Sequence, residues 1–351
     1  MRTASVGPPA GCSVTARVPG LPRAALSELS ALSDGGVSMR SSAAEWLAEL
    51  GEPGAVAPDP GWEFGKGVLP ASVRTLPAKT LWWLDRFREQ ARERGVPADD
   101  VDRWLGLARP ALRTAPDGGG PVVGRLGSPL LLPPDVPTPA MVVEPDYRAE
   151  YQLIVTLDLA AIPPTATDLP LPPDGQVLLF ANVELEDEVL AGGAVHVPAG
   201  TPVEAREVSV DYEAYGYDSP EDLDESLRRS PDLRLVPGVS LPSCPLDAET
   251  RAAHPYAETL QAVWSEQTDE GGEWQVGGYA YDFDGYGDPA RESADQECGR
   301  EPGEGSSRPE DWVVLAQWVG VPMGILYWTI DRRDLAARRF DRVVVQMYAN
   351  P

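Results

Sequence analysis

Residues 311–348 read DWVVLAQWVGVPMGILYWTIDRRDLAARRFDRVVVQMY, the part of the chain whose secondary structure is most clearly indicated. Both alternating faces of residues 312–318 are mostly apolar, which predicts a central strand covered on both sides. Residues 320–324 supply turn chemistry, and residues 325–330 are rich in the aromatic and β-branched side chains typical of strands. The two apolar segments therefore predict a β-hairpin inside a sheet.

A short helix and a returning strand are expected after this hairpin. Asp331 stands at an N-cap position, and Asp334 follows three residues later, as in a capping box. Leu335 is expected to face inward, and residues 340–348 return to β composition. The order strand, strand, helix, strand follows.

Composition favours a β-rich, acidic protein. The 351 residues include 42% hydrophobic residues, 37 prolines and 34 glycines, which favour turns and extended connections around a sizeable core. The net charge is -26, and the acidic surplus lies after residue 80. Such a surface repels phosphate backbones and anionic lipid, so we expect neither nucleic acid nor membrane as a partner. The acidic surface excludes neither a basic protein partner nor metal ions.

Cysteine usage indicates a reducing compartment. Cys12, Cys244 and Cys298 form no CxxC pair and have no metal-ligand spacing, and their odd number favours free thiols. Cys244 and Cys298 could pair if the protein were exported, but the start of the chain has no continuous apolar segment typical of a signal peptide. We therefore expect a cytoplasmic protein without a cofactor.

Three regions are predicted along the chain. Residues 1–40, rich in proline, glycine, serine and alanine, are expected to be a disordered extension; the alternative is a true start at Met39, with residues 1–38 not translated. Residues 41–79 comprise a short helix at 42–50 and a Pro/Gly linker. Residues 80–351 are expected to form a single domain.

This domain is predicted to begin with a helical hairpin, residues 80–94 and then 97–108, with Pro97 as the first residue of the second helix. Short strands follow at 122–123, 130–132, 151–159, 176–183, 195–197 and 205–210, and further helices at 219–229 and 255–267. Residues 265–311 read as a long acidic excursion that contains glycine.

Two parts of the domain have similar sequence patterns. Residues 151–159, a spacer and residues 175–180 resemble residues 312–318, a shorter spacer and residues 324–328. Both read as a strand, a turn and a Gly-x-aliphatic-x-aromatic strand, which indicates a duplicated β unit packed face to face or edge to edge. The predicted fold class is α+β, predominantly antiparallel β, with a duplicated β unit, an N-terminal helical hairpin and a few peripheral helices.

An ordered set of motifs carries a family resemblance, at residues 122–133, 153–159, 169–180, 277–279 and 312–340. Taken together, residues 80–351 resemble the YwqG-like family of bacterial proteins of unknown function. The resemblance implies a single cytosolic α+β domain dominated by antiparallel sheet and no established activity, with an immunity or accessory role as its one functional hint.

This chain departs from the family pattern at polar positions. Ser128 replaces the second glycine before the Leu-Pro motif, and Thr156 replaces the glutamine of the first central strand, whereas Gln317 keeps the second glutamine. Residues 322–323, Pro-Met, replace a Gly-Asp pair. Any reaction that depends on those polar groups is therefore in doubt for this member.

Residues 279–288 are the densest candidate stretch. Asp282, Asp284 and Asp288 resemble a calcium loop, but Tyr286 occupies its fifth position and Ser293 stands where a bidentate glutamate is needed. We therefore expect no metal, and favour a solvated acidic loop whose tyrosines pack on the body. A partner-binding loop is the middle interpretation, because exposed tyrosines beside carboxylates suit basic protein surfaces. The candidate contacts are Tyr279, Tyr281, Asp282, Asp284, Tyr286, Asp288 and Gln317.

Several polar groups have both a structural and a functional interpretation. Gln317 either bonds the backbone of an adjacent loop, which we favour, or contacts a ligand. The pair Gly277 and Gly278 is expected to permit a bulge or a close backbone approach. His196 is expected in a strand, and His254 at a helix cap.

Five arginines, residues 332, 333, 338, 339 and 342, form either an anion site or, as we favour, an ion-paired or solvated face. The spacing of Asp334 and Arg338 predicts an ion pair on a helix surface.

Two functional hypotheses remain. The first is a non-enzymatic binding or scaffold protein whose acidic loops after residue 205 meet a basic protein partner. The second is an enzyme with an unfamiliar, metal-assisted hydrolytic site between the two β units, built around Gln317, Asp282 and Asp284.

Overall fold

The computed structural model describes residues 68–115, 118–127, 129–144, 147–182, 191–206, 231–268, 273–282, 285–298, 308–321 and 324–349. All of them lie in the larger of two units, Val56–Pro351. The predicted extension at 1–40, the helices at 42–50 and 219–229, strand residues 207–210 and the candidate Asp284 lie outside the described residues. The three predicted regions stay predictions.

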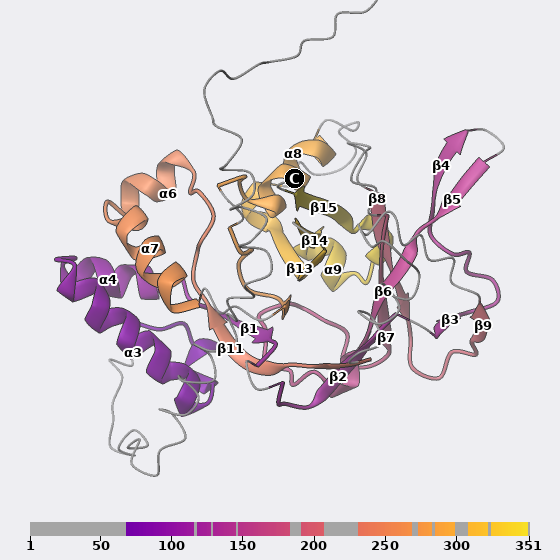
Figure 1. Ribbon diagram of the computed structural model, residues 1–351, viewed down its shortest axis with the longest axis horizontal. Coiled ribbons are helices and arrows are strands. Elements are labelled where there is room, and N and C mark those ends of the chain that lie inside the picture. Colours follow the sequence, from indigo (N-terminus) through magenta and orange to yellow (C-terminus); the bar gives the residue numbers. More distant parts are fainter. Residues whose placement is uncertain are drawn as a thin grey trace, which may run out of the picture. The chain divides into compact units, whose positions relative to one another are not determined.

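A six-stranded sheet contains the predicted hairpin (Figure 1). Its order is β11 (Val236–Ser240), β1 (Arg109–Arg113), β12 (Trp274–Val276), β13 (Trp312–Val321), β14 (Gly324–Asp331) and β15 (Val344–Ala349). All neighbouring strands are antiparallel. The hairpin is β13 and β14, and β13 has a strand on each side, so its predicted interior position is confirmed.

A five-stranded antiparallel sheet forms the second layer, in the order β10 (Asp232–Arg234), β2 (Val122–Leu126), β6 (Gln152–Asp158), β7 (Gln176–Asn182) and β8 (Ala191–Val197). Two smaller pairs join β3 (Leu130–Leu132) to β9 (Glu204–Arg206), and β4 (Ala140–Glu144) to β5 (Tyr147–Glu150). The predicted antiparallel α+β class is confirmed.

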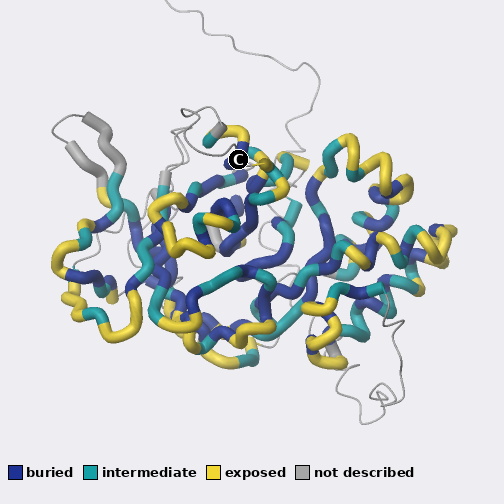
Figure 2. The backbone as a smooth tube through the Cα atoms, turned by 180° about the vertical axis from the view of Figure 1, so that it is seen from behind, coloured by how far each residue is buried: buried dark blue, intermediate teal, exposed yellow. Residues whose placement is uncertain are grey.

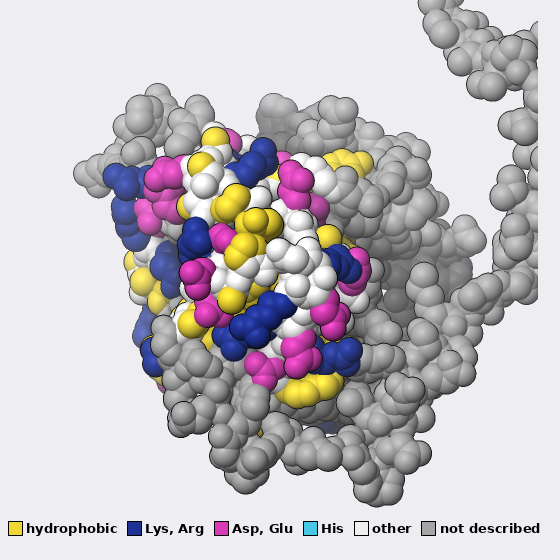
Figure 3. All heavy atoms as spheres, turned by 90° about the vertical axis from the view of Figure 1, so that its left-hand side faces the viewer, with side chains coloured by type: hydrophobic (Ala, Val, Ile, Leu, Met, Phe, Trp, Pro, Cys, Tyr) yellow, Lys and Arg dark blue, Asp and Glu magenta, His cyan; other side chains and the backbone are white. Residues whose placement is uncertain are grey.

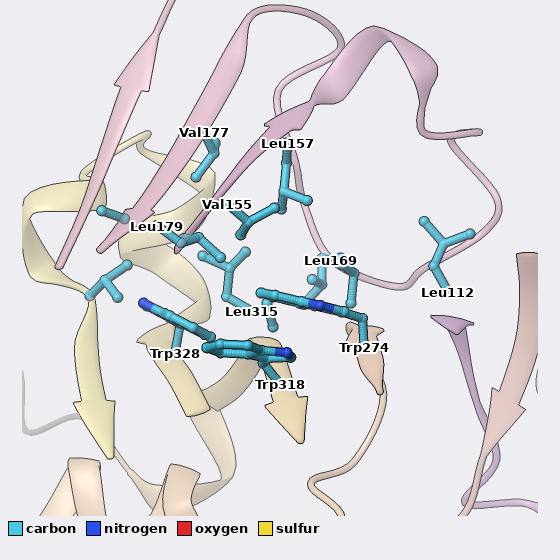
Figure 4. Close-up of a cluster of buried hydrophobic side chains, with 14 of the residues drawn as sticks. Leu112, Val155, Leu157, Leu169, Val177, Leu179, Trp274, Leu315, Trp318 and Trp328 are labelled. Atoms are coloured by element: carbon cyan, nitrogen blue, oxygen red, sulfur yellow. The ribbon is translucent and has the colours of Figure 1, made fainter. Parts of the chain in front are cut away.

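The two large sheets share one apolar core, to which both contribute aliphatic side chains (Figure 4). Trp274 stacks on Trp318 and Trp328, with ring centroids 5.4 and 6.1 Å apart. The indole nitrogen of Trp328 donates a 3.0 Å hydrogen bond to the carbonyl oxygen of Phe180 in β7. The segments of the predicted duplication, β6–β7 and β13–β14, thus lie one in each sheet; their duplication stays a prediction.

A second core lies among the helices α3 (Ala78–Glu93), α4 (Ala98–Leu105) and α7 (Ala257–Thr268) and strand β11, whereas the short helix α6 (Ala248–Ala253) has no buried residue. Phe87 of α3 meets Trp264 of α7 edge to face at 5.9 Å. The predicted helical hairpin, α3 and α4, is confirmed, although Pro97 is the N-cap of α4 and not its first residue. Figure 2 shows buried positions following the strands and the inward sides of these helices.

Some elements differ from the sequence-based expectation. The helix predicted to reach residue 108 ends at Leu105, and Arg109–Arg113 forms β1. Residues 265–311 contain β12 and helix α8 (Pro289–Cys298), where a long excursion was expected. Three-residue β12 is too short to show alternation, so local pattern could not reveal it.

The end of the chain follows the prediction closely. Helix α9 (Arg332–Ala336) begins after Asp331, whose carboxylate accepts a 2.7 Å hydrogen bond from the amide of Arg333. The predicted N-cap is therefore confirmed. Short 3-10 turns occur at Val73–Thr75, Leu159–Ala161, Pro309–Asp311 and Phe340–Arg342. The last of these occupies the beginning of the segment expected to be β.

Candidate functional site

Two buried glutamines fix a loop on the face of the six-stranded sheet that points away from the five-stranded sheet. Gln275 and Gln317 are cross-strand partners in β12 and β13. The Gln275 amide nitrogen donates to the carbonyl oxygens of Gly277 and Tyr279, at 2.8 and 2.7 Å. Gln317 Oε1 accepts a 2.9 Å bond from the Tyr281 amide. This is the structural role that the sequence favoured for Gln317.

The two glycines of this loop allow its close approach to the sheet. Gly277 and Gly278 have φ values of +72° and +76°, a region that side-chain-bearing residues rarely adopt. A Cβ atom on Gly278 would lie 2.8 Å from the Cβ of Ser240 and 2.9 Å from that of Ala111. The expected close backbone approach is confirmed.

A row of tyrosines leads from this loop to the surface. The Tyr327 hydroxyl donates a 2.8 Å bond to the carbonyl oxygen of Tyr281. The Tyr327 ring lies 5.2 Å from that of Tyr348, and Tyr348 stacks on Tyr286 at 5.5 Å. Burial raises the pKa of Tyr327 and Tyr348 well above the usual value, so both phenols are neutral at physiological pH. Tyr286, 49% exposed, ends the row at the surface.

Asp288 has a structural role at the end of the loop. Its carboxylate accepts a 3.0 Å hydrogen bond from the Ala290 amide at the start of α8. Burial raises the pKa of Asp288, against the opposing effect of that hydrogen bond and of Arg291. Within the described ranges, no group of three or more His, Cys, Asp or Glu side chains could hold a metal ion. Of the three predicted aspartates, Asp282 and Asp288 lie on this face, and Asp284 is outside the described residues.

Two pockets border the loop, and Tyr279 lines both. One, of about 250 Å³, includes Arg109, Cys244, Asp288 and Trp312 among its lining residues. Burial, followed by the negative charge of Asp288, raises the pKa of the Cys244 thiol well above its usual value. The thiol is therefore a poor nucleophile at neutral pH.

The second pocket, of about 290 Å³, lies between β1 and α7, with Arg113, Trp264, Tyr281 and Asp282 in its wall. Tyr279, like Ser243, lines both pockets. Its hydroxyl donates to the carbonyl oxygen of Leu107 at 2.8 Å, and the Arg109 guanidinium lies 4.3 Å from its ring centroid. Sequence reasoning missed Arg109, Arg113 and Gln275 because it missed β1 and β12.

Comparison with known families assigns the chain to a protein family. Residues 125–348 match a family described as a domain of unknown function, DUF1963. The chain belongs to this family. A comparison with curated proteins gave no match. The DUF1963 match takes in the glutamine-held loop and the row of tyrosines, while Arg109 and Arg113 precede it. No helix in the described part of the chain is long and apolar enough to cross a membrane.

Three of the five arginines in the cluster of this DUF1963 member form ion pairs, which agrees with the paired or solvated face that the sequence favoured. Arg332 contacts Asp168 at 2.9 Å, Arg333 contacts Asp311 at 2.9 Å, and Arg339 pairs with Asp334. The expected pair of Asp334 with Arg338 is wrong. Helix α9 ends at Ala336 and Arg338 has a φ of +61°, so the two residues do not share a helix face.

Both histidines occupy structural positions. His254 caps a helix, but as the C-cap residue of α6 and not at the start of the helix predicted at 255–267, and it meets Trp104 edge to face at 5.4 Å. His196 lies in β8, as predicted, with its ring 5.2 Å from that of Phe340. Burial is the main cause that lowers the pKa of each imidazole. Both are therefore neutral at physiological pH.

Proposed function

We propose that this chain is a non-enzymatic, YwqG-like cytoplasmic binding module that recognises a basic protein surface around Tyr286. The observation that carries the proposal is the half-exposed Tyr286 ring, stacked on the buried ring of Tyr348. A ring held in place before binding loses little conformational entropy when a partner contacts it.

The backbone on either side of Tyr286 supports this recognition role. Gly285 and Gly287 have φ values of +77° and +129°. A Cβ atom on Gly287 would lie 2.9 Å from a carboxylate oxygen of Glu292, so that carboxylate lies close to the loop. An aromatic face beside a carboxylate suits a lysine or arginine side chain, which gains a cation–π contact and an ion pair. The net charge of -26 also favours a cationic partner.

The distribution of charge on another side of the molecule also favours the loop at Tyr286 as the binding surface. On the helix-bearing side shown in Figure 3, the coloured Lys and Arg side chains are interspersed with Asp and Glu, in a mixed pattern. Among the helices, Arg88 pairs with Asp102 at 3.0 Å, and Arg94 pairs with Glu266. A mixed surface gives a basic partner less electrostatic discrimination than the loop at Tyr286.

The enzymatic alternative placed its site between the two β units. That space is filled by the stacked tryptophans and aliphatic side chains of the shared core (Figure 4). Gln317 bonds the loop on the opposite face of the six-stranded sheet, and Asp282 continues that loop. Gln317 and Asp282 therefore do not line the space between the sheets, and their geometry favours binding.

The test compares partner retention by three immobilised proteins: wild type, Tyr286→Ala and the control Tyr256→Ala. Tyr256 is 38% exposed and lies between α6 and α7, so its truncation removes a similar aromatic surface elsewhere. We expect a stoichiometric basic protein that wild type and Tyr256→Ala retain, and Tyr286→Ala loses. Equal retention by all three proteins would contradict the proposal. One tightly held divalent ion per chain would support the enzymatic alternative.

A further inference from the structure

A second site of different chemistry lies at Arg113, in the wall of the 290 Å³ pocket between β1 and α7. Its aliphatic stem passes Gly238 of β11, where an added Cβ would touch the Arg113 Cδ atom at 3.5 Å. Its Nε donates a 2.7 Å hydrogen bond to Gln275 Oε1. Gln275 is itself held by the two carbonyl bonds of its amide nitrogen. The guanidinium is thus positioned by β11 and β12, and its two Nη groups form no hydrogen bond with any residue that the structure describes.

Arg113 forms no ion pair with a carboxylate in the described part of the chain. Among the described residues, none has a carboxylate oxygen within 4.0 Å of its guanidinium nitrogens, whereas Arg109 on the same face of β1 reaches Asp168 at 3.9 Å. Loss of hydration lowers the pKa of Arg113 to about 10, so it still carries its charge at neutral pH. A half-buried cation without an ion pair loses part of its hydration, and an anionic ligand would offset that cost.

The walls of the pocket indicate what kind of anion fits. Trp264, Tyr279 and Tyr281 supply aromatic surface, and Ser240 and Ser243 supply hydroxyl groups. The carboxylates of Glu258 and Asp282 also line the pocket and would repel a ligand with several negative charges. The volume of about 290 Å³ is at the lower limit for small-molecule sites.

We propose that this pocket binds a small organic monocarboxylate with an aromatic or apolar body, whose carboxylate accepts hydrogen bonds from the two Nη groups of Arg113. A planar guanidinium matches a carboxylate in a two-bond geometry. The body of the ligand packs against Trp264 and Tyr279. The site is independent of the surface at Tyr286, and Arg113 precedes the span that matches the DUF1963 family.

Isothermal titration calorimetry with 3-phenylpropionate tests the proposal, with phenethylamine and inorganic phosphate as comparison probes. We expect saturable binding of 3-phenylpropionate and at least tenfold weaker binding of the other two. Arg113→Met should weaken 3-phenylpropionate binding at least tenfold. Arg125→Met, the same substitution at an exposed position of β2, should leave it unchanged.

A second pair of variants leaves Arg113 in place. Ala262 is an exposed residue of α7 in the wall of the pocket, so Ala262→Trp should obstruct the pocket and abolish binding. Ala252→Trp, at an exposed position of α6, should keep it. This pair decides the question if Arg113→Met does not fold. The proposal is overturned if 3-phenylpropionate does not bind wild type, if Ala262→Trp binds it normally, or if phenethylamine binds equally well.

Discussion

The two faces of the six-stranded sheet are both buried along β14 but differ chemically. Strand β14 alternates between them: Leu326, Trp328 and Ile330 join the core shared with the five-stranded sheet, whereas Ile325 and Tyr327 face the other side. The inner face consists of apolar surface. The outer face adds hydroxyl and amide groups that hold a loop and helix α8. Burial of apolar area therefore stabilises the fold on one side, and directional bonds position the candidate site on the other.

The largest expected effect is on the inner face. Trp274→Ala removes a buried ring that stacks on two other tryptophans, so we expect a loss of about 3–5 kcal/mol in the free energy of unfolding. Trp82, which is only partly buried, provides the matched control, and Trp82→Ala should cost less than half as much. Chemical denaturation measures both. A loss for Trp274→Ala no larger than that of the control would show that the inner face does not dominate stability.

A substitution on the outer face should reduce stability by a smaller amount, and its effect should be concentrated in the loop that this face holds. Gln317→Leu keeps the buried volume but leaves the Tyr281 amide without its acceptor, which should cost about 1–3 kcal/mol. Hydrogen exchange of the Tyr281 amide should accelerate more than exchange in β7, which belongs to the other sheet. A uniform acceleration in both places would mean that Gln317 acts through global stability and not by holding the loop.

Removal of the helix cap next to the hairpin should lower the free energy of unfolding by a smaller amount than Gln317→Leu does. Asp331→Ala deletes the acceptor of the Arg333 amide, with an expected loss of about 1 kcal/mol. Asp341→Ala, an exposed aspartate of the following 3-10 turn, is the control and should change stability by less than about 0.5 kcal/mol. Thermal unfolding of the two variants separates these values, and equal losses would exclude the cap as the cause.

His254 should contribute to the loss of stability as the pH falls. Burial lowers the pKa of this imidazole in the folded state, so the unfolded chain binds the proton more readily. Stability should fall as the pH drops below the ordinary histidine pKa of about 6.5. His254→Gln should lose less stability than wild type between pH 7 and pH 5, since the other titrating groups are shared. Identical pH profiles would show that His254 does not titrate differently in the two states.

The sequence predicted what local pattern encodes. The hairpin β13–β14, the Asp331 cap and the backbone-bonding role of Gln317 follow from apolar runs, cap chemistry and the rule that buried amides are hydrogen-bonded. Strand β1 was missed because Pro110 suggested only a helix end. The proline is accommodated because β12 pairs with Leu112 and Arg113 only, so no strand needs the missing donor of Pro110 on that side.

The Arg113 pocket could not be predicted for a related reason. Its key hydrogen bond joins Arg113 to Gln275, residues 162 positions apart in the chain. No periodicity or spacing connects two such short strands before their pairing is known. The tyrosines of residues 279–288 were found because they are close in sequence, whereas the stacking of Tyr286 on Tyr348 required the position of β15.

Partner retention by Tyr286→Ala, compared with that of Trp274→Phe, tests most directly whether stability and recognition belong to opposite faces of the sheet. We predict that the free energy of unfolding of Tyr286→Ala lies within about 0.5 kcal/mol of the wild-type value, as expected for a surface position. The same variant should lose the basic partner. Trp274→Phe should be less stable yet retain that partner at temperatures where it is folded. If Tyr286→Ala retains the partner while Trp274→Phe, still folded, loses it, the assignment of recognition to the outer face is contradicted.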